Sequence, residues 1–521
     1  MDTLLNKFGS VVKGVITGFD RIIFKGTLQS IVYAVGMQYF LMTQGVLNKD
    51  FKAYAMENSN KIVESADEIS ERLCGCRTIY LPSSNERKET VVRKRQEETG
   101  VTEGLIGVWS CVESCYTFRS TFNPGATYPI LKSEPSRCKH IYFYFDDPVY
   151  GFMSVRLQTW APYGIQIALN GREWLRRSLD SINCAYTLSG NKFLHIDDYD
   201  LAQTLLDAQL NTNFVSMLNS FLPSVFPCMQ EILGENMSYY WMLWQSEEAT
   251  DYIFESPDAL KPLMDDFLLY SLITGTGDRI LKYFGAPVKL NGQPRINSNP
   301  EILSRASLWY DGLRVRHWSG KNSVKFYNEQ NVLRFEATVN DPGQFRIYRH
   351  TENQDKSEPK KLLPMRKGVA DINVRSKVSR NIIKRFTEHL SAMEEKTRLG
   401  ELLKPITQPL MVGGKRIRAL DPFGKDLKLL QAISDPAFDA DAITNKGLRE
   451  ILEDSTWAKG MSGKRLSARI SRHLSLLRKH GLIKKLPNQW KYTLTDRGRK
   501  VTTSICVALA ASVNDLLKLA A

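Results

Sequence analysis

The sequence predicts an α+β fold: a mixed α/β N-terminal body with an antiparallel β-meander, followed by a C-terminal winged helix-turn-helix. Between residues 139 and 182, runs rich in β-branched and aromatic residues precede an amphipathic helical run. Residues 312–340 hold three short alternating segments separated by turn residues. After residue 424, three helical segments, a two-stranded ribbon and a closing helix follow one another, which is the order of elements in a winged helix.

Local composition predicts the elements of the body in order. Helical periodicity predicts helices over 57–73, 172–182 and 368–399, and makes 198–285 mainly helical. The polar stretch 83–100 is expected to be a charged connector or an exposed helix, and 349–361 a loop. Strands are expected over 139–147, within 151–171 and in the meander.

The chain has 521 residues, 43% of them hydrophobic, which is enough for two or three buried cores. A stretch rich in Pro, Gly and basic residues without clear periodicity, near residue 420, suggests the last domain boundary. We therefore expect a mixed helical region over 1–135, an α+β core over 136–400 with the meander at 312–348, a linker over 401–424, and a winged-helix nucleic-acid-binding domain over 425–521.

The overall charge indicates the class of partner. The formal net charge is +14 and the pI is about 9.2, which favours polyanions such as nucleic acid. No run of about 18 apolar residues suggests a membrane span, so a cytoplasmic protein without a membrane partner is expected. The sequence holds no Walker loop, dinucleotide fingerprint, nucleophile elbow or kinase motif, which disfavours NTP hydrolysis and hydride transfer.

Most of this charge lies near the C-terminus. Residues 411–500 contain 20 Lys and Arg against 9 Asp and Glu, an excess of 11 positive charges. On the predicted third helix, 462–481, an apolar stripe and an arginine stripe lie on different sides. The candidate nucleic-acid contacts of this domain come from that helix, the ribbon and the closing helix: Lys464, Arg465, Arg469, Arg472, Lys484, Lys485, Lys491 and Arg497. The alternative is a protein-docking domain with a solvated basic face.

The segments "LLRKHGLI" and "YTLTDRGRK", at 476–483 and 492–500, resemble the helix-to-wing passage of MarR-type winged-helix domains. The resemblance implies that the third helix enters a groove and that the ribbon grips the backbone. A separate hypothesis is a transcriptional regulator whose body senses a ligand or forms a dimer, which predicts a palindromic site.

The meander carries the candidate chemistry of the body. Alternate residues of a strand share a face, so three strands paired in sequence order would have one apolar and one polar face. The polar face would gather Arg314, Arg316, Lys325, Tyr327, Arg334 and Glu336. Such a face suits phosphodiester contact, with Arg314 and Arg316 as further nucleic-acid-binding residues, although a solvated sheet face with cross-strand ion pairs is a simpler interpretation.

With further carboxylates, this face could hold Mg²⁺ or Mn²⁺ for strand cleavage. The enzyme hypothesis is a metal-dependent nuclease, nicking enzyme or recombinase centred on Glu336, with Tyr327 as a candidate nucleophile and Lys325 and Arg334 beside it. The other candidate ligands are Asp146, Asp147 and Glu247, which the sequence alone does not bring together. In "QSEEATD", 245–251, Glu247 and Asp251 would share a helical face.

The segments "KFYNE" and "LRFE", within 325–336, are similar to the Lys-x-Tyr and Arg-x-Glu strand pairs of rolling-circle replication initiators. Those enzymes often use a His-apolar-His metal motif, and none of the seven histidines here forms one. A metal would therefore have to rest on carboxylates. Two close cysteine pairs, Cys74 with Cys76 and Cys111 with Cys115, could form a zinc site, but reduced core thiols are the stronger expectation.

Several segments together resemble a family of long uncharacterised bacterial proteins, whose genes look like accessory genes of mobile or multi-copy elements. They are "FDRIIFKG" (19–26), "VRLQTWAPYGIQIALNGREWL" (155–175), "QSEEATD", "SVKFYNEQNVLRFEATVNDP" (323–342) and "PMRKGVADI" (364–372). The resemblance implies DNA, or structured RNA, as the partner and assigns no catalytic residue. The leading expectation is therefore a nucleic-acid-binding protein, with the nuclease and the regulator as alternatives.

Overall fold

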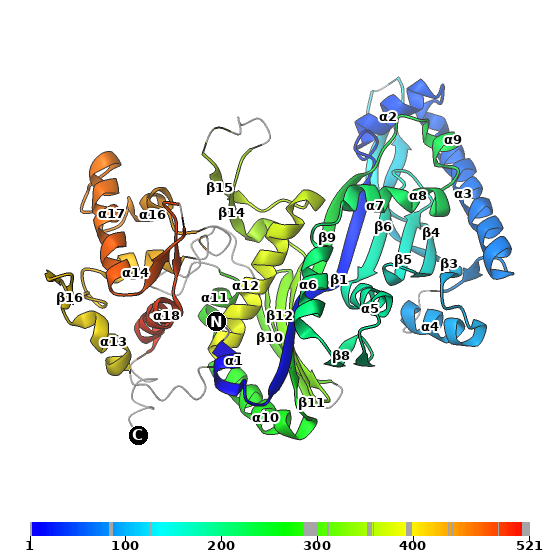
Figure 1. Cartoon of the computed structure of the whole chain (residues 1–521). Coiled ribbons are helices and arrows are strands. Elements are labelled where there is room, and N and C mark those ends of the chain that lie inside the picture. The colour runs from blue at the N-terminus through cyan, green and yellow to red at the C-terminus, as the bar shows by residue number, and fades with distance from the viewer. Residues whose placement is uncertain are drawn as a thin grey trace.

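The protein is described by a computed structural model, which covers residues 3–512 except 83–86, 126, 286–300, 310–311, 352–356, 358, 392–398, 436–437, 439–441 and 488. Its body is built on an eleven-stranded mixed sheet (Figure 1). In spatial order the strands are β10 (Ile302–Trp309), β11 (Gly312–Ser319), β12 (Asn322–Glu329), β13 (Val332–Val339), β9 (Tyr240–Phe254), β1 (Val12–Thr27), β6 (Ile165–Asn170), β5 (Gly151–Gln158), β4 (Ile130–Asp147), β3 (Gly104–Thr121) and β2 (Ile79–Tyr80). The β2–β3 pair is parallel and the other pairs are antiparallel.

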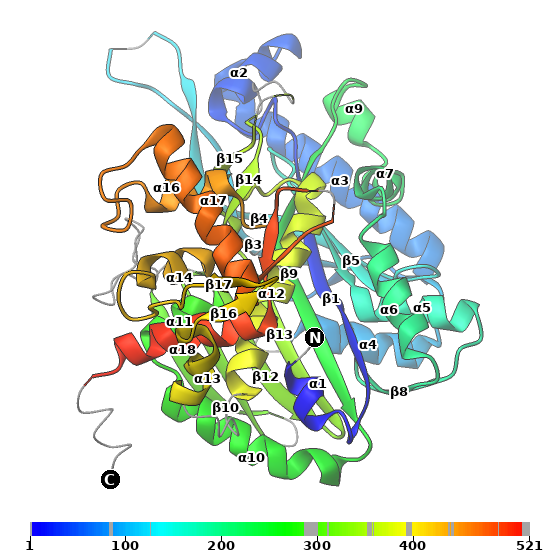
Figure 2. The ribbon, with the colours of Figure 1, turned by 60° about the vertical axis from the view of Figure 1, so that its left-hand side comes forward.

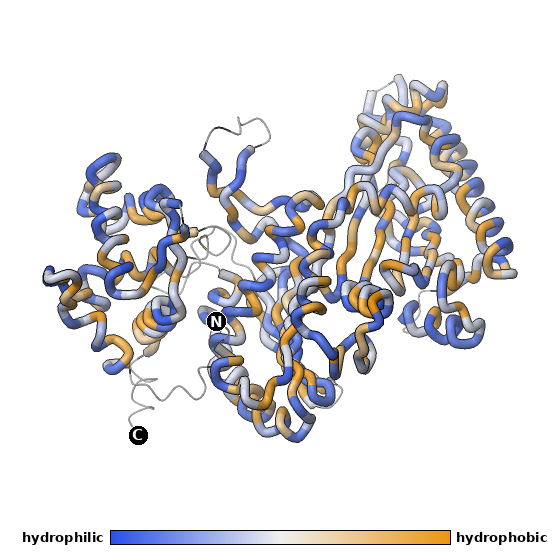
Figure 3. The backbone as a smooth tube through the Cα atoms, in the orientation of Figure 1, coloured by the Kyte–Doolittle hydropathy of each residue, from blue (hydrophilic) through white to orange (hydrophobic). Residues whose placement is uncertain are grey.

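Two groups of helices bury one face of this sheet in two apolar clusters (Figures 1 and 2). Over β3 to β6 the packing elements are α2 (Ala34–Thr43), α3 (Phe51–Cys74), α7 (Phe214–Ser220), α8 (Leu222–Val225) and α9 (Met229–Leu233). Over β9 to β13 they are α1 (Thr3–Phe8), α10 (Pro257–Thr274), α11 (Gly277–Tyr283) and α12 (Ile372–Ser391). The central strands are accordingly largely orange in Figure 3, because their side chains are mainly apolar.

Helices α5 (Gly171–Ser181) and α6 (Tyr199–Gln209), with the hairpin of β7 (Tyr186–Ser189) and β8 (Lys192–Ile196), pack beside the part of β1 that β6 leaves unpaired. Gln203 on α6 bonds both backbone groups of Thr17 there, at 2.7 and 3.0 Å. The side chain of Asn170 caps α5 by accepting bonds from two backbone N–H groups. A Cβ at Gly171 would lie 2.1 Å from the carbonyl oxygen of Phe19, so this close approach requires glycine.

The predicted meander is confirmed. Strands β11, β12 and β13 pair in sequence order, with Lys325 opposite Glu336 and Tyr327 opposite Arg334. The helices expected at 57–73 and 172–182 are confirmed as α3 and α5, and α4 (Lys88–Thr99) makes the exposed-helix alternative for 83–100 the correct one.

Two expectations about the body are wrong. Residues 1–135 are not a separate mixed helical region, because β1 lies at the centre of the sheet and the proposed boundary at 135 falls inside β4. Residues 240–254 are not helical, because they form β9, which pairs with β1 and β13 on its two sides. Tertiary pairing overrides local periodicity in both segments.

The C-terminal part has its own apolar core. It contains α13 (Leu399–Thr407), β16 (Leu410–Val412), β17 (Lys415–Ile417), α14 (Leu427–Ile433), α16 (Asn445–Leu452), α17 (Gly463–Lys479), β18 (Ile483–Lys485), β19 (Tyr492–Leu494) and α18 (Asp496–Ala510). The stretch 401–424, expected to be a linker, instead adds Leu403, Ile406 and Leu420 to this core. The predicted apolar stripe of α17 is buried, and Gly481, at φ +71°, follows the end of the helix.

The remaining described elements include the small hairpin of β14 (Arg346–Arg349) and β15 (Lys361–Pro364) and three short 3₁₀ turns, Asn48–Asp50, Pro342–Gln344 and Val369–Asp371. Within the part of the chain that the structure describes, we find no helix with the length and apolar character needed to span a bilayer.

Candidate metal centre

Three carboxylates meet on the sheet. One oxygen from each of Asp20, Glu247 and Glu336 lies within 4.8 Å of the others. Asp20 and Glu336 are buried, while Glu247 is half-buried, so the cluster is reached from the side of Glu247. Among the described residues, this is the sole group of three or more Asp, Glu, His or Cys side chains arranged to hold a metal ion.

Strand order explains how these residues meet. Strands β13, β9 and β1 are neighbours, so one residue from each strand can face the same spot. Glu336 is opposite Ala249, and Glu247 is two residues away on β9, on the same face. Asp20 comes from a β-bulge, because the register jumps from Phe19 to Arg21 and leaves Asp20 as the extra residue. Bulges re-aim side chains in this way beside functional sites.

Buried hydrogen bonds fix the Asp20 carboxylate. Its Oδ1 accepts a bond of 2.5 Å from the Asn191 amide and one of 3.2 Å from Arg334. Arg334 is 1% exposed and also donates two bonds, of 2.5 and 2.8 Å, to Asp251, which Arg172 contacts at 3.0 Å. Arg334 therefore acts as a positioning residue that ties β13 to the bulge of β1.

The two buried aspartates have opposite pKa shifts. The pKa of Asp20 is raised, chiefly by burial, with the negative charge of Glu336 adding to the rise and Arg334 opposing it. Burial alone would also raise the pKa of Asp251, but Arg334 and Arg172 overcome it and lower that pKa. Two arginines therefore stabilise the ionised form of Asp251, whereas the positive charge around Asp20 is too small to offset the cost of burying its carboxylate.

The three carboxylates are under-neutralised by their neighbours. Lys325 forms an ion pair with Glu336, and Arg334, which contacts Asp20, is shared with Asp251. A divalent cation would supply the missing positive charge, and carboxylate oxygens are the ligands that Mg²⁺ and Mn²⁺ prefer. The residues present therefore fit a hard divalent cation.

The structure brings together the predicted polar face of the meander, but buries much of it. Lys325, Tyr327, Arg334 and Glu336 are each less than a tenth exposed, so the face is not the solvated sheet surface of the simpler interpretation. The side chain of Arg334 is buried and bonds Asp20 and Asp251 instead of reaching the surface.

Tyr327 is a poor nucleophile. Its side chain is buried against Trp309, with ring centroids 5.6 Å apart, and burial raises its pKa well above its ordinary value. The phenolate needed for attack is therefore disfavoured, and we do not retain the nucleophile hypothesis. Arg314 and Arg316 are half-buried at the edge of the same face, and the guanidinium of Arg314 lies 4.0 Å from the Trp309 ring centroid.

Of the other proposed ligands, Glu247 joins the centre and the two adjacent acids do not. Asp146 accepts a bond from Gln96 and pairs with Arg177, whereas Asp147 caps the turn at Val149 and Tyr150. The cysteine pairs form no metal cluster within the described ranges, and the eight cysteines are free.

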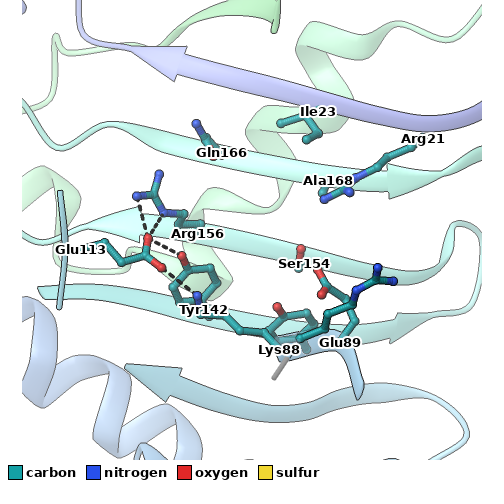
Figure 4. Close-up of a pocket in the computed structure, with 12 residues that line it drawn as sticks. Arg21, Ile23, Lys88, Glu89, Glu113, Tyr142, Ser154, Arg156, Gln166 and Ala168 are labelled. Atoms are coloured by element: carbon teal, nitrogen blue, oxygen red, sulfur yellow. Dashed lines mark hydrogen bonds and ion pairs between the residues drawn. The ribbon is translucent and has the colours of Figure 1, made fainter. Parts of the chain in front are cut away.

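The structure also contains a polar hollow of about 430 Å³ (Figure 4). Its walls include Arg21, the neighbour of Asp20 at the bulge, and Arg156 on β5. On one side Glu113 accepts bonds from Lys88, Tyr142 and Arg156, at 2.7, 2.6 and 3.1 Å. Although burial opposes the shift, these three donors lower the pKa of Glu113 to about 2, so it stays ionised.

The C-terminal candidates differ in exposure. Six are exposed: Lys464, Arg465, Arg472, Lys484, Lys485 and Arg497. Lys491 is half-buried, and Arg469 is half-buried with its guanidinium 4.4 Å from the Trp457 ring centroid. Arg469 is therefore partly committed to packing rather than pointing freely outward. Ser462 occupies the N-cap position of α17 but makes no capping bond with its side chain.

Asp20 is the candidate site residue that the sequence did not reveal. The signal available was the pair Asp20-Arg21, which interrupts the alternation of a strand-like segment, "VITGFDRIIFKG". In the structure the bulge lies at this pair, with Asp20 as its extra residue.

Comparison with protein-family models, curated proteins and solved structures finds no match for this chain. The family resemblances of the sequence therefore stay predictions.

Proposed function

We propose that the protein is a metal-dependent enzyme that cleaves phosphodiester bonds in nucleic acid, with Asp20, Glu247 and Glu336 holding Mg²⁺ or Mn²⁺. The observation that carries the proposal is the meeting of these three carboxylates within 4.8 Å, beside too few cations to neutralise them. A bound divalent cation would supply Lewis-acid polarisation of the phosphate and help to ionise a water.

The residues around the centre have distinct roles in this proposal. Arg334 and Asn191 hold the Asp20 carboxylate in place. Lys325, paired with Glu336, is a donor for the negative charge that grows on the phosphate oxygens during attack by water. Water adds its oxygen to phosphorus, the bond from phosphorus to one sugar oxygen breaks, and the proton lost by water is returned to that leaving oxygen.

The C-terminal region is proposed to be a winged helix that binds nucleic acid, DNA before structured RNA. The order α14, α16, α17, β18, β19, α18 supports it, as does the excess of positive charge in this part of the chain. Arg465 and Arg472 on α17, with Lys484 and Lys485 on the hairpin, would contact the backbone or base edges. The body would then act on nucleic acid that this domain retains, in keeping with the expectation of a mobile or accessory element.

The test is cleavage of labelled single-stranded and duplex oligonucleotides of DNA and RNA, with Mg²⁺ or Mn²⁺ and with chelator. Cleavage should require the metal and should be abolished by Glu336→Gln. The matched control is Glu64→Gln, because Glu64 is an exposed glutamate on α3 with no ion pair among the described residues. It should leave cleavage unchanged.

Equal metal-dependent cleavage by Glu336→Gln and wild type would place the activity elsewhere or in a contaminant. Binding of nucleic acid without any cleavage under these conditions would favour the alternative of a binding protein or regulator, for which the basic C-terminal region is the supporting observation.

A further inference from the structure

A row of polar side chains crosses the sheet beside the metal centre. Lys25 on β1 is opposite Gln166 on β6, and Gln166 is opposite Arg156 on β5. Paired residues on neighbouring strands point to the same face, so these side chains form a line. Figure 4 places Gln166 and Arg156 on adjacent strands on the hollow's face. Lys25 is four residues from Arg21 on the same strand, a displacement of about 13 Å.

A second lysine joins this row at Trp244. Trp244 is the extra residue of another bulge, where Ile23 is opposite Gln245 and Phe24 is opposite Leu243. The Nζ atoms of Lys25 and Lys367 lie 4.6 and 4.7 Å from the Trp244 ring centroid. The indole therefore attracts both ammonium groups by cation–π interaction.

The charge of these two lysines is not balanced by the protein. Within the described residues, neither Lys25 nor Lys367 forms an ion pair with a carboxylate. The pKa of Lys25 is lowered by burial, and the positive charges of Arg156 and Lys367 lower it further. A group of cations that repel one another in this way favours the approach of an anion.

We propose that Lys25, Lys367 and Arg156, with Gln166, bind a backbone phosphate of the nucleic-acid strand whose scissile phosphodiester lies at the metal centre. This inference rests on the proposed function and extends it, because it gives the path of the strand across β1, β6 and β5. The spacing of about 13 Å equals the rise of about four stacked nucleotides. Substrates that reach from one site to the other should therefore bind better than shorter ones.

The test is the salt dependence of oligonucleotide binding, measured by fluorescence anisotropy with Ca²⁺ in place of Mg²⁺ to suppress turnover. Loss of one phosphate contact in the double variant Lys25→Ala/Lys367→Ala should reduce the slope of log affinity against log salt by about 0.7 to 0.9. The matched control is Lys261→Ala, an exposed lysine on α10. The control should keep the wild-type slope.

Two results would contradict the proposed phosphate contact with the strand. An unchanged slope in a double variant with a wild-type melting temperature overturns the inference. A titration with inorganic phosphate separates the source of the anion: if the double variant loses only phosphate binding and keeps the oligonucleotide slope, the site serves free phosphate and the strand path is wrong.

Failure of the phosphate contact and failure of the proposed function can be told apart. If Mg²⁺-dependent cleavage by wild type is established while the double variant keeps the wild-type slope, only the phosphate row fails. If the slope falls as expected but no metal-dependent cleavage is found, the phosphate contact stands and the assignment of chemistry to Asp20, Glu247 and Glu336 fails.

Discussion

Replacing Asp20 by Asn should separate metal binding from stability. The pKa of Asp20 is raised in the folded protein, chiefly by burial. The folded state therefore holds that proton more tightly than the unfolded state, and the stability gained in this way is lost as pH rises through the folded pKa. Above that folded pKa the ionised carboxylate opposes folding of the metal-free protein. Asp20→Asn should thus leave the unfolding free energy of metal-free protein unchanged or raise it by about 0.5–2 kcal/mol.

The expected metal effect follows from linkage. At a metal concentration about 100 times Kd, binding adds about 2.7 kcal/mol to the stability of the wild type. The unfolding entropy of a 521-residue chain is about 1.1 kcal/mol/K if it unfolds as one unit. The wild-type melting temperature should therefore rise by about 2.5 °C on addition of Mn²⁺. Asp20→Asn should lose most of this rise, because it removes one of three charged ligands.

Differential scanning calorimetry with Mn²⁺ and with chelator measures both quantities. The matched control is Asp265→Asn, because Asp265 is an exposed aspartate on α10 with no ion pair among the described residues. This control should behave as wild type. Asp20 is not a metal ligand if Asp20→Asn keeps the full metal-dependent rise in melting temperature. Destabilisation of the metal-free variant by more than about 3 kcal/mol would instead show that Asp20 is a structural buried charge.

Three further perturbations test other parts of the structure. Arg334→Met leaves two buried carboxylates without their shared partner and should lower the unfolding free energy by about 3–5 kcal/mol in urea titration. The control Arg77→Met, at an exposed ion pair, should change the unfolding free energy little. Equal effects of the two substitutions would contradict the positioning role of Arg334. The pKa of Glu113 is lowered from 4.5 to about 2 by its three donors, so its stabilisation is present above pH 4.5 and is lost as pH falls toward 2. Glu113→Gln should flatten that part of the stability profile, and an unaltered profile would show that other groups govern acid unfolding. Arg465→Ala with Arg472→Ala should weaken oligonucleotide binding and reduce its salt slope by about 1.4–1.8, and an unchanged anisotropy titration would exclude α17 as the contact.

Part of the candidate site could be predicted from the meander. The alternation of Lys325, Tyr327, Arg334 and Glu336 is a local property of extended chains, and the hairpin turns between β11, β12 and β13 leave sequence-order pairing as the simplest topology. Their shared face was therefore predictable. Burial of that face was not, because it depends on Trp309 and on Lys192, from separate strands.

The misassignment of β9 has a physical cause. Residues i and i+4 share a face in a helix and also in a strand, so the grouping of Glu247 with Asp251 did not distinguish the two. The partners of β9 are β1 and β13, and neither lies near it in the sequence. Only these pairings make residues 240–254 extended, and they also separate the roles of the two acids: Glu247 joins the metal centre, and Asp251 pairs with Arg334.

The sequence by itself determined the elements whose information is local: the apolar stripe of α17, the two-faced strands of the meander and the concentration of positive charge near the C-terminus. Only the tertiary structure decided that Asp20, Glu247 and Glu336 meet. Asp20 and its holder Arg334 are 314 residues apart, and their approach depends on the order β13-β9-β1 and on one bulge. Strand order is chosen by which apolar faces can be buried together over the whole chain, and no local pattern contains that information.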